Sequence, residues 1–151
     1  MKRLAGLVLL LLGMAQPALA EPVPVKITAD TFEIAQNEKQ ATFSGKVVVT
    51  RGTLTLTADS VTVFYGTDGE GDIDRMVATG NVRVESDGQK AKGDRAEFDP
   101  ATRIIRISGH VTVTNAQGTM NGPELLIDLS GKSSTFSSGK GGRVSGVFTP
   151  K

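Results

Sequence analysis

Three aspartates each follow directly on a small residue: Asp30, Asp59 and Asp94. Carboxylates aligned in neighbouring layers could bind a divalent cation, because calcium and magnesium take oxygen ligands. Like charges in adjacent layers also repel one another, and aspartate commonly hydrogen-bonds the backbone of turns. We therefore expect each aspartate to bond the backbone of its own corner, and we expect no metal site.

His110 is the only histidine, and the chain has no cysteine. In the segment GHVTV, His110 occupies a position that faces away from the valines, which predicts a solvated surface residue. A general base needs positioned partners, and neither a Ser-His-Asp nor a Cys-His set can be assembled convincingly here. We expect no catalytic residues and no cofactor, so an enzyme such as a periplasmic hydrolase ranks last among the functions considered.

Two short motifs resemble known ion or phosphate loops but lack essential residues. The acidic segment 68–74, DGEGDID, has the alternate carboxylates of a calcium loop, yet Ile73 and Thr79 stand where glycine and glutamate are needed. The segment 131–134, GKSS, resembles the end of a phosphate loop, but Leu126 replaces its first glycine. The first motif predicts an acidic turn, and the second predicts no nucleotide site.

One eight-residue phrase occurs four times. Its copies are ITADTFEI (27–34), LTADSVTV (56–63), AKGDRAEF (91–98) and MNGPELLI (120–127). Each contains a small residue three places before an apolar one, and these small residues lie 29, 35 and 29 positions apart. A second phrase, Gly-x-Val-x-Val, begins at Gly45, Gly80 and Gly109. A recurring period of this size is typical of stacked supersecondary units.

Both phrases predict β-strands, because apolar residues alternate at a period of two and valine and threonine are frequent. After each small residue the alternation slips by one position, as it does at a β-bulge or corner. Stacked corners would fold the strands at one height around an apolar trough. The expected structural corners are Ala29, Asp30, Ala58, Asp59, Gly93, Asp94 and Gly122. The expected residues of the apolar inner face are Phe32, Ile34, Phe43, Val47, Val49, Leu54, Leu56, Val61, Val63, Val82, Val84, Phe98, Ile105, Ile107, Val111, Val113, Met120, Leu125 and Ile127.

Composition and the first residues predict an exported protein with one domain. Residues 1–20 have the basic start, apolar run and Ala-Leu-Ala end of a cleavable signal peptide. We expect a β-domain over 21–138 and a flexible glycine-rich tail over 139–151. The net charge of +1 becomes −1 without Lys2 and Arg3, the only charged residues of the signal. This balance gives no basic footprint for nucleic acid.

The repeated segments resemble the LptA family, the OstA-like periplasmic lipopolysaccharide-transport proteins. The resemblance rests on ITADTFEI, ATFSGKVVVTRGTLTLTAD, MVATGNVRVESDGQKAKGD and IIRISGHVTV, and it covers about residues 25 to 130. It implies an antiparallel β-jelly roll, open at both ends, that holds the acyl chains of lipid A in its interior. The cleaved signal favours the free periplasmic member of the family.

The same resemblance implies the partners. These would be lipopolysaccharide, an inner-membrane anchored OstA-like protein of the transporter complex, the N-terminal domain of an outer-membrane translocon, and further copies joined head to tail. We expect the N-terminal edge around Val25 to Ile34, and the C-terminal edge around Leu125 to Phe136 or Arg143 to Phe148. In the fourth unit Pro123-Glu124 replaces the corner aspartate, which predicts an irregular last layer. The alternative is a structural or adhesive β-repeat module that binds no lipid.

Overall fold

The computed structural model describes residues 23–66, 72–138 and 142–150, so the expected signal peptide, residues 1–20, lies outside the described residues, as does most of the acidic segment 68–74. These ranges contain strands and turns, and no helix within them is long and apolar enough to cross a membrane. The strands are β1 (Lys26–Thr28), β2 (Thr31–Ala35), β3 (Gln40–Arg51), β4 (Leu54–Tyr65), β5 (Ile73–Ser86), β6 (Gln89–Asp99), β7 (Ile104–Asn115), β8 (Gly118–Asp128), β9 (Ser133–Ser137) and β10 (Ser145–Phe148).

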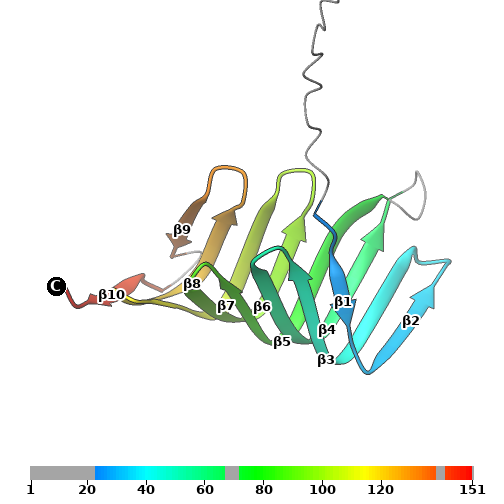
Figure 1. Ribbon diagram of the computed structural model, residues 1–151, viewed down its shortest axis with the longest axis horizontal. Coiled ribbons are helices and arrows are strands. Elements are labelled where there is room, and N and C mark those ends of the chain that lie inside the picture. Colours follow the sequence, from blue (N-terminus) through cyan, green and yellow to red (C-terminus); the bar gives the residue numbers. More distant parts are fainter. Residues whose placement is uncertain (1–22, 67–71, 139–141, 151) are drawn as a thin grey trace, which may run out of the picture.

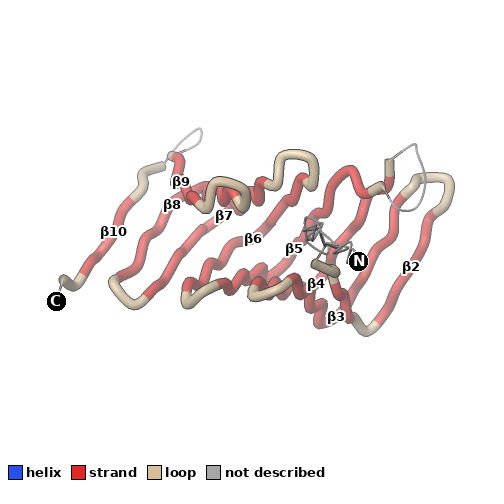
Figure 2. The backbone as a smooth tube through the Cα atoms, turned by 45° about the horizontal axis from the view of Figure 1, so that its top comes forward, coloured by secondary structure: helices blue, strands red, loops and turns tan. Residues whose placement is uncertain are grey.

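All described strands belong to one antiparallel sheet (Figures 1 and 2). Strands β3 to β8 pair in sequence order, while β1 and β2 pair with the two halves of β3, and β9 and β10 with the two halves of β8. Figure 1 shows the strands stacked along the long axis, with β2 at one end and β10 at the other. The sheet is not closed, which confirms the predicted all-β jelly-roll fold with two open ends.

The long strands bend where their pairing shifts. In the pairing of β3 with β4 the register shifts between Ser44 and Val47, so that Gly45 and Lys46 together face Asp59. Equivalent shifts occur between β5 and β6 and between β7 and β8. Gly45 has φ 81° and Lys46 has φ 48°, a left-handed conformation that glycine adopts most readily. Two residues facing one is a β-bulge, and it lies at the corner that the sequence predicted. The bulges divide the sheet into two leaves, called here the β2–β9 leaf and the β1–β10 leaf after their first and last strands.

Small residues at the corners make room for side chains of the next strand. Gly93 lies opposite Val82, and a Cβ added to Gly93 would overlap with Cγ2 of Ile107 on β7. A Cβ on Gly122 would come within 2.9 Å of Cδ1 of Phe136 on β9. Glycine is therefore required at positions 93 and 122, because apolar side chains of the β2–β9 leaf lie directly against the corner.

The corner aspartates contact the neighbouring strand, which corrects the expectation that they bond the backbone of their own corner. Asn81 Nδ2 donates to Asp59 Oδ2 over 3.0 Å, and His110 Nδ1 lies 2.9 Å from Asp94 Oδ2. The side chain of His110 is 93% exposed, as its position in the strand predicted. Each carboxylate lies over a glycine of the next strand, so that a Cβ there would overlap with it: Asp30 over Gly45, Asp59 over Gly80 and Asp94 over Gly109.

The C-terminal segment is part of the sheet, so the expectation of a flexible tail over 139–151 is wrong for its described part. Ser145–Phe148 forms β10 and pairs with β8. Gly142 has φ 116°, and a Cβ on it would lie 2.9 Å from Cγ of Pro123. Pro123 thus takes the place over Gly142 that an aspartate takes in the other units. Residues 139–141 lie outside the described part of the chain.

We predict that Gly93→Ala lowers the free energy of unfolding by about 1–3 kcal/mol, because its methyl group overlaps with Ile107 in a packed corner. Chemical denaturation of the mature protein measures the loss. Ile107→Ala removes the opposing Cγ2 atom, so Gly93→Ala should cost much less in that background. An equal cost in both backgrounds would contradict this account of the corner.

Candidate functional site

The inner face of the sheet consists of continuous rows of apolar residues. The register aligns Phe32, Phe43, Val61, Ala78, Ala96, Ile107, Leu125 and Phe136 across the β2–β9 leaf. A parallel row on the same leaf contains Ile34, Ala41, Val63, Met76, Phe98, Ile105 and Ile127. The β1–β10 leaf contributes Ile27, Val49, Leu56, Val84, Ala91, Val113 and Met120. The structure therefore places the sequence-predicted inner residues on one face, together with several alanines and Met76, which the sequence analysis does not include.

Burial divides these inner residues into two groups. Nearest the corner, six side chains are less than 2% exposed and pack as core: Val47, Val61, Val82, Ile107, Val111 and Leu125. Other inner side chains are only partly buried and pack against the core, among them Leu54, Leu56, Phe98, Val113 and Ile127. The second group is the one that a ligand in the trough could touch.

Two cavities lie along the trough. The narrower has a volume of about 60 Å³ and is lined mainly by apolar residues of both leaves, including Leu56, Phe98 and Ile105. The wider, of about 540 Å³, lies toward β8 and β9, where Val113 and Ile127 form apolar walls and Lys132 belongs to a more polar rim. Leu54 and Leu129 line both cavities and mark the boundary between them. The larger of these two cavities therefore lies toward the C-terminal end of the trough.

Both ends of the sheet expose large apolar side chains. Phe32 belongs to an inner row and stacks near Phe43 with ring centroids 4.7 Å apart, yet it is 53% exposed because β2 has no neighbour on its other side. At the other end Val147 is 73% and Phe148 59% exposed on β10. Among the described residues, every exposed large hydrophobic lies in or beside an end strand: Val23, Val25, Phe32, Ile34, Val144, Val147 and Phe148.

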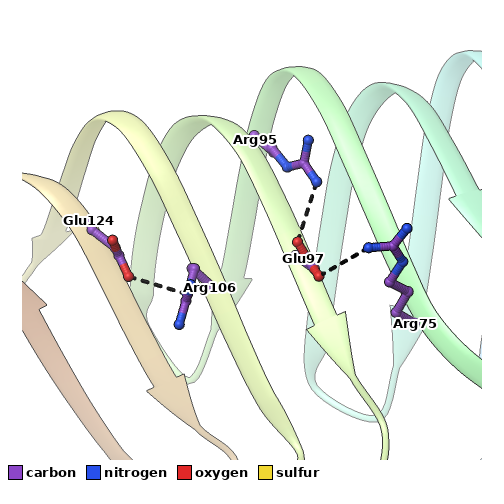
Figure 3. Close-up of polar contacts among 5 residues, drawn as sticks. All are labelled: Arg75, Arg95, Glu97, Arg106 and Glu124. Atoms are coloured by element: carbon purple, nitrogen blue, oxygen red, sulfur yellow. Dashed lines mark hydrogen bonds and ion pairs between the residues drawn. The ribbon is translucent and has the colours of Figure 1, made fainter. Parts of the chain in front are cut away.

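The outer face of the sheet is polar and carries ion pairs within and between strands (Figure 3). Oε2 of Glu97 lies 3.3 Å from Nη2 of Arg95, and Oε1 of Glu97 lies 3.8 Å from Nη1 of Arg75. Nε of Arg106 lies 3.2 Å from Oε1 of Glu124. The arginines are about half exposed and the glutamates are partly exposed, so solvent screens each pair and its contribution to stability is small. No group of metal-binding side chains occurs within the described ranges. The asymmetry between an apolar inner face and a solvated outer face gives the sheet one surface suited to apolar ligands.

The fold and the inner face define an open β-jelly roll with a single apolar trough. Residues 26–132 match the family model described as "LptA/(LptD N-terminal domain) LPS transport protein", and the chain belongs to this family. The fold is similar to the crystal structure of LptH, the LptA homologous periplasmic component of the lipopolysaccharide transport device of Pseudomonas aeruginosa. That match has a TM-score of 0.72 and 20% identity, and covers 85% of this chain and 96% of LptH.

Two curated proteins are also similar in sequence. An uncharacterised protein of Rhizobium meliloti (strain 1021) is 31% identical over 118 residues, which are 74% of this chain and 63% of the relative. LPS-assembly protein LptD of Pseudomonas putida (strain GB-1) is 28% identical over 109 residues, which are 72% of this chain and 10% of that protein. The chain thus spans less than two thirds of either relative.

The division of the inner face by burial gives a second prediction. Ile107→Ala should lower the free energy of unfolding by about 2–5 kcal/mol, because Ile107 is fully buried at the corner. Ile127→Ala, the same substitution in a partly buried residue that lines the wider cavity, should cost clearly less. Urea titrations of both variants measure the difference, and equal losses would mean that the trough is packed as tightly as the corner.

Proposed function

We propose that this protein is a non-enzymatic carrier of lipopolysaccharide in the periplasm, and that it holds the acyl chains of lipid A in the apolar trough. The observation that supports this most directly is the unbroken apolar inner face, which runs from β2 to β9 on a sheet that does not close. Membership of a lipopolysaccharide-transport family supports the choice of ligand. A cleaved signal peptide over residues 1–20 would deliver the protein to the periplasm.

Energetics favour a continuous trough over a closed pocket. Transfer of a twelve-carbon chain from water contributes at most about 10 kcal/mol, at roughly 0.8 kcal/mol per methylene. Several chains held at that maximum would never leave a closed pocket. In a continuous trough a lipid moves between equivalent apolar contacts, so that little free energy separates successive positions. The energy for directed movement would come from a partner.

The same carrier would bridge the two membranes. Its partners would be an inner-membrane anchored OstA-like protein, the N-terminal domain of the outer-membrane translocon, and further copies joined head to tail. Two observations support this arrangement: each end of the sheet has an unpaired strand edge, and each end exposes apolar side chains. Open edges of this kind favour the addition of another strand.

A charge placed in the trough should weaken lipid binding strongly. Val113→Asp puts a carboxylate on the apolar wall of the wider cavity, where burial beneath an acyl chain is costly. Thr114→Asp, the matched control one position along β7, puts the same charge on the exposed outer face. Displacement of a fluorescent fatty acid by purified lipopolysaccharide should show at least about tenfold weaker binding for Val113→Asp, a loss of roughly 1.4 kcal/mol, and little change for Thr114→Asp.

Thermal melts of both variants should be compared first, to verify that each is folded. Equal lipid binding by the two folded variants would rule out the trough as the binding surface. Organic-solvent extraction of the native protein, followed by mass spectrometry, tests the alternative of a structural or adhesive module. Absence of any bound lipid, combined with no fatty-acid binding in vitro, would favour that module.

A further inference from the structure

The outer face of the β1–β10 leaf carries more basic than acidic residues. Its outward positions alternate with inner residues such as Val84 and Ala91, and the residues at the other outward positions are uncharged, most of them threonine. The exposed charged residues of this face are Lys26 on β1, Arg83 and Glu85 on β5, and Lys90 and Lys92 on β6. We call this surface the basic face.

The basic face lacks the ion pairs that balance the outer face of the other leaf. On the β2–β9 leaf, each of the three arginines shown in Figure 3 lies no more than 3.8 Å from a glutamate oxygen. On the basic face only Lys90 has such a partner, with Nζ 3.8 Å from Oε1 of Glu85. Lys26, Arg83 and Lys92 form no ion pair with any described residue. The whole chain is nearly neutral, so this imbalance arises from where the charges lie.

Arg83 and Lys92 are a cross-strand pair of like charge. The register of β5 and β6 places Arg83 directly opposite Lys92, whereas two residues along the same strands Glu85 lies opposite Lys90. Opposite charges that face each other across two strands are stabilising, and like charges in the same arrangement are destabilising. A local rule that is obeyed at one pair and broken at the next, with no compensating contact, is typical of a functional site.

Two corner carboxylates border the basic face without neutralising this pair. Asp94 lines a depression together with Arg83 and Lys92, and Asp59 lines another beside Arg83. Each aspartate already contacts the residue after a bulge glycine, at 2.9 Å for Asp94 and 3.0 Å for Asp59. Within the described part of the chain, neither aspartate forms an ion pair with Arg83 or Lys92. The pair is therefore open to an anion from outside the molecule.

We propose that the basic face docks onto a membrane surface rich in anionic lipid headgroups, with Arg83 and Lys92 as its principal contacts. Neighbouring strands lie about 4.8 Å apart, and β1 and β6 are four steps apart in the strand order, so the basic residues are spread over roughly 19 Å. A single phosphate ion would reach only two adjacent side chains, whereas a membrane presents phosphates across the whole width. The basic face and the trough lie on opposite faces of the sheet, so docking is independent of what the trough binds.

Docking of this kind is weak and sensitive to salt. One basic residue close to an anionic membrane contributes about fivefold to the affinity. Four basic residues less Glu85 leave an excess of three charges, which corresponds to roughly 100-fold at most. The attraction acts only within a Debye length, about 8 Å at physiological ionic strength. The protein would therefore stay near the membrane without being anchored to it.

Flotation of the mature protein with lipid vesicles tests the proposal. Vesicles of phosphatidylcholine alone are compared with vesicles in which one lipid in three is phosphatidylglycerol. The partition coefficient should be at least about tenfold higher for the anionic vesicles, and the difference should disappear in 0.5 M salt. Equal partition into both kinds of vesicle would overturn the proposal, because uptake of lipid by the trough requires no anionic surface.

Charge reversal locates the contact. Lys92→Glu changes the charge of the basic face by two units and should lower partition into anionic vesicles at least about fivefold. Lys39→Glu, the same change in the exposed turn between β2 and β3 on the other leaf, should have little effect. Equal losses for the two variants would assign binding to overall charge and would overturn the role of the basic face.

A second variant guards against misfolding. Arg83→Glu reverses the charge from the opposite strand and should weaken partition as much as Lys92→Glu does. Each variant places a carboxylate opposite a basic residue, as Glu85 lies opposite Lys90, so neither should lower the melting temperature. Unchanged partition of both folded variants would show that the Arg83–Lys92 pair does not contact the membrane.

Inorganic phosphate distinguishes a membrane surface from a discrete phosphate site. At equal ionic strength, phosphate and chloride should release the protein from anionic vesicles to the same extent. Stronger release by phosphate would mean that Arg83 and Lys92 bind a single phosphate, and would overturn docking onto a membrane. The fatty-acid displacement assay reports on the trough alone, so failure of either proposal is recognised separately from failure of the other.

Discussion

The bulge at the middle of each Gly-x-Val strand is the constraint on which the rest of the structure depends. Two residues in left-handed conformation face one residue of the following strand, and the carboxylate of the preceding strand lies over the glycine. Because a side chain on that glycine would overlap with the carboxylate, the aspartate requires a glycine beneath it, and in the last unit Pro123 takes the place of the aspartate. Every long strand therefore bends at the same height, and the two leaves face each other across one continuous apolar surface.

Sequence reasoning could predict the fold because the repeat is visible in the residues themselves. The alternation of apolar and polar residues predicted the strands, and the shift of that alternation after each small residue predicted the corners. Together these two patterns predicted which residues lie on the inner face. Sequence reasoning could not separate core from lining, since Ile107, Ile105 and Ile127 are the same residue type in the same alternation. Ile107 and Ile105 are nevertheless buried, whereas Ile127, directly opposite Ile105, is only partly buried. The contacts of Asp59 and Asp94 were also missed, because a carboxylate that bonds its own turn and one that bonds its neighbour look alike in a single sequence.

The last strand was missed for a different reason. Gly142-Arg143-Val144 repeats the Gly-x-Val phrase, but the four residues before it displace the phrase from its expected spacing, and Gly146 stands where the second valine would be. A glycine-rich composition then favoured the interpretation of a tail. Pairing of Ser145–Phe148 with β8 restores the repeat, so backbone hydrogen bonding identifies an element that side-chain spacing had hidden.

In the proposed carrier, the apolar inner face would have two physical tasks that conflict in a closed barrel. A stable core requires side chains to be packed without gaps, whereas a lipid path requires apolar surface that is left uncovered. Burial differs along the inner face: side chains such as Val47, Ile107 and Leu125 are almost fully buried, whereas Val113 and Ile127 are only partly buried. Stability can therefore be supplied by residues such as Val47 and Leu125, which leaves Val113, Ile127 and their neighbours free to exchange one apolar contact for another.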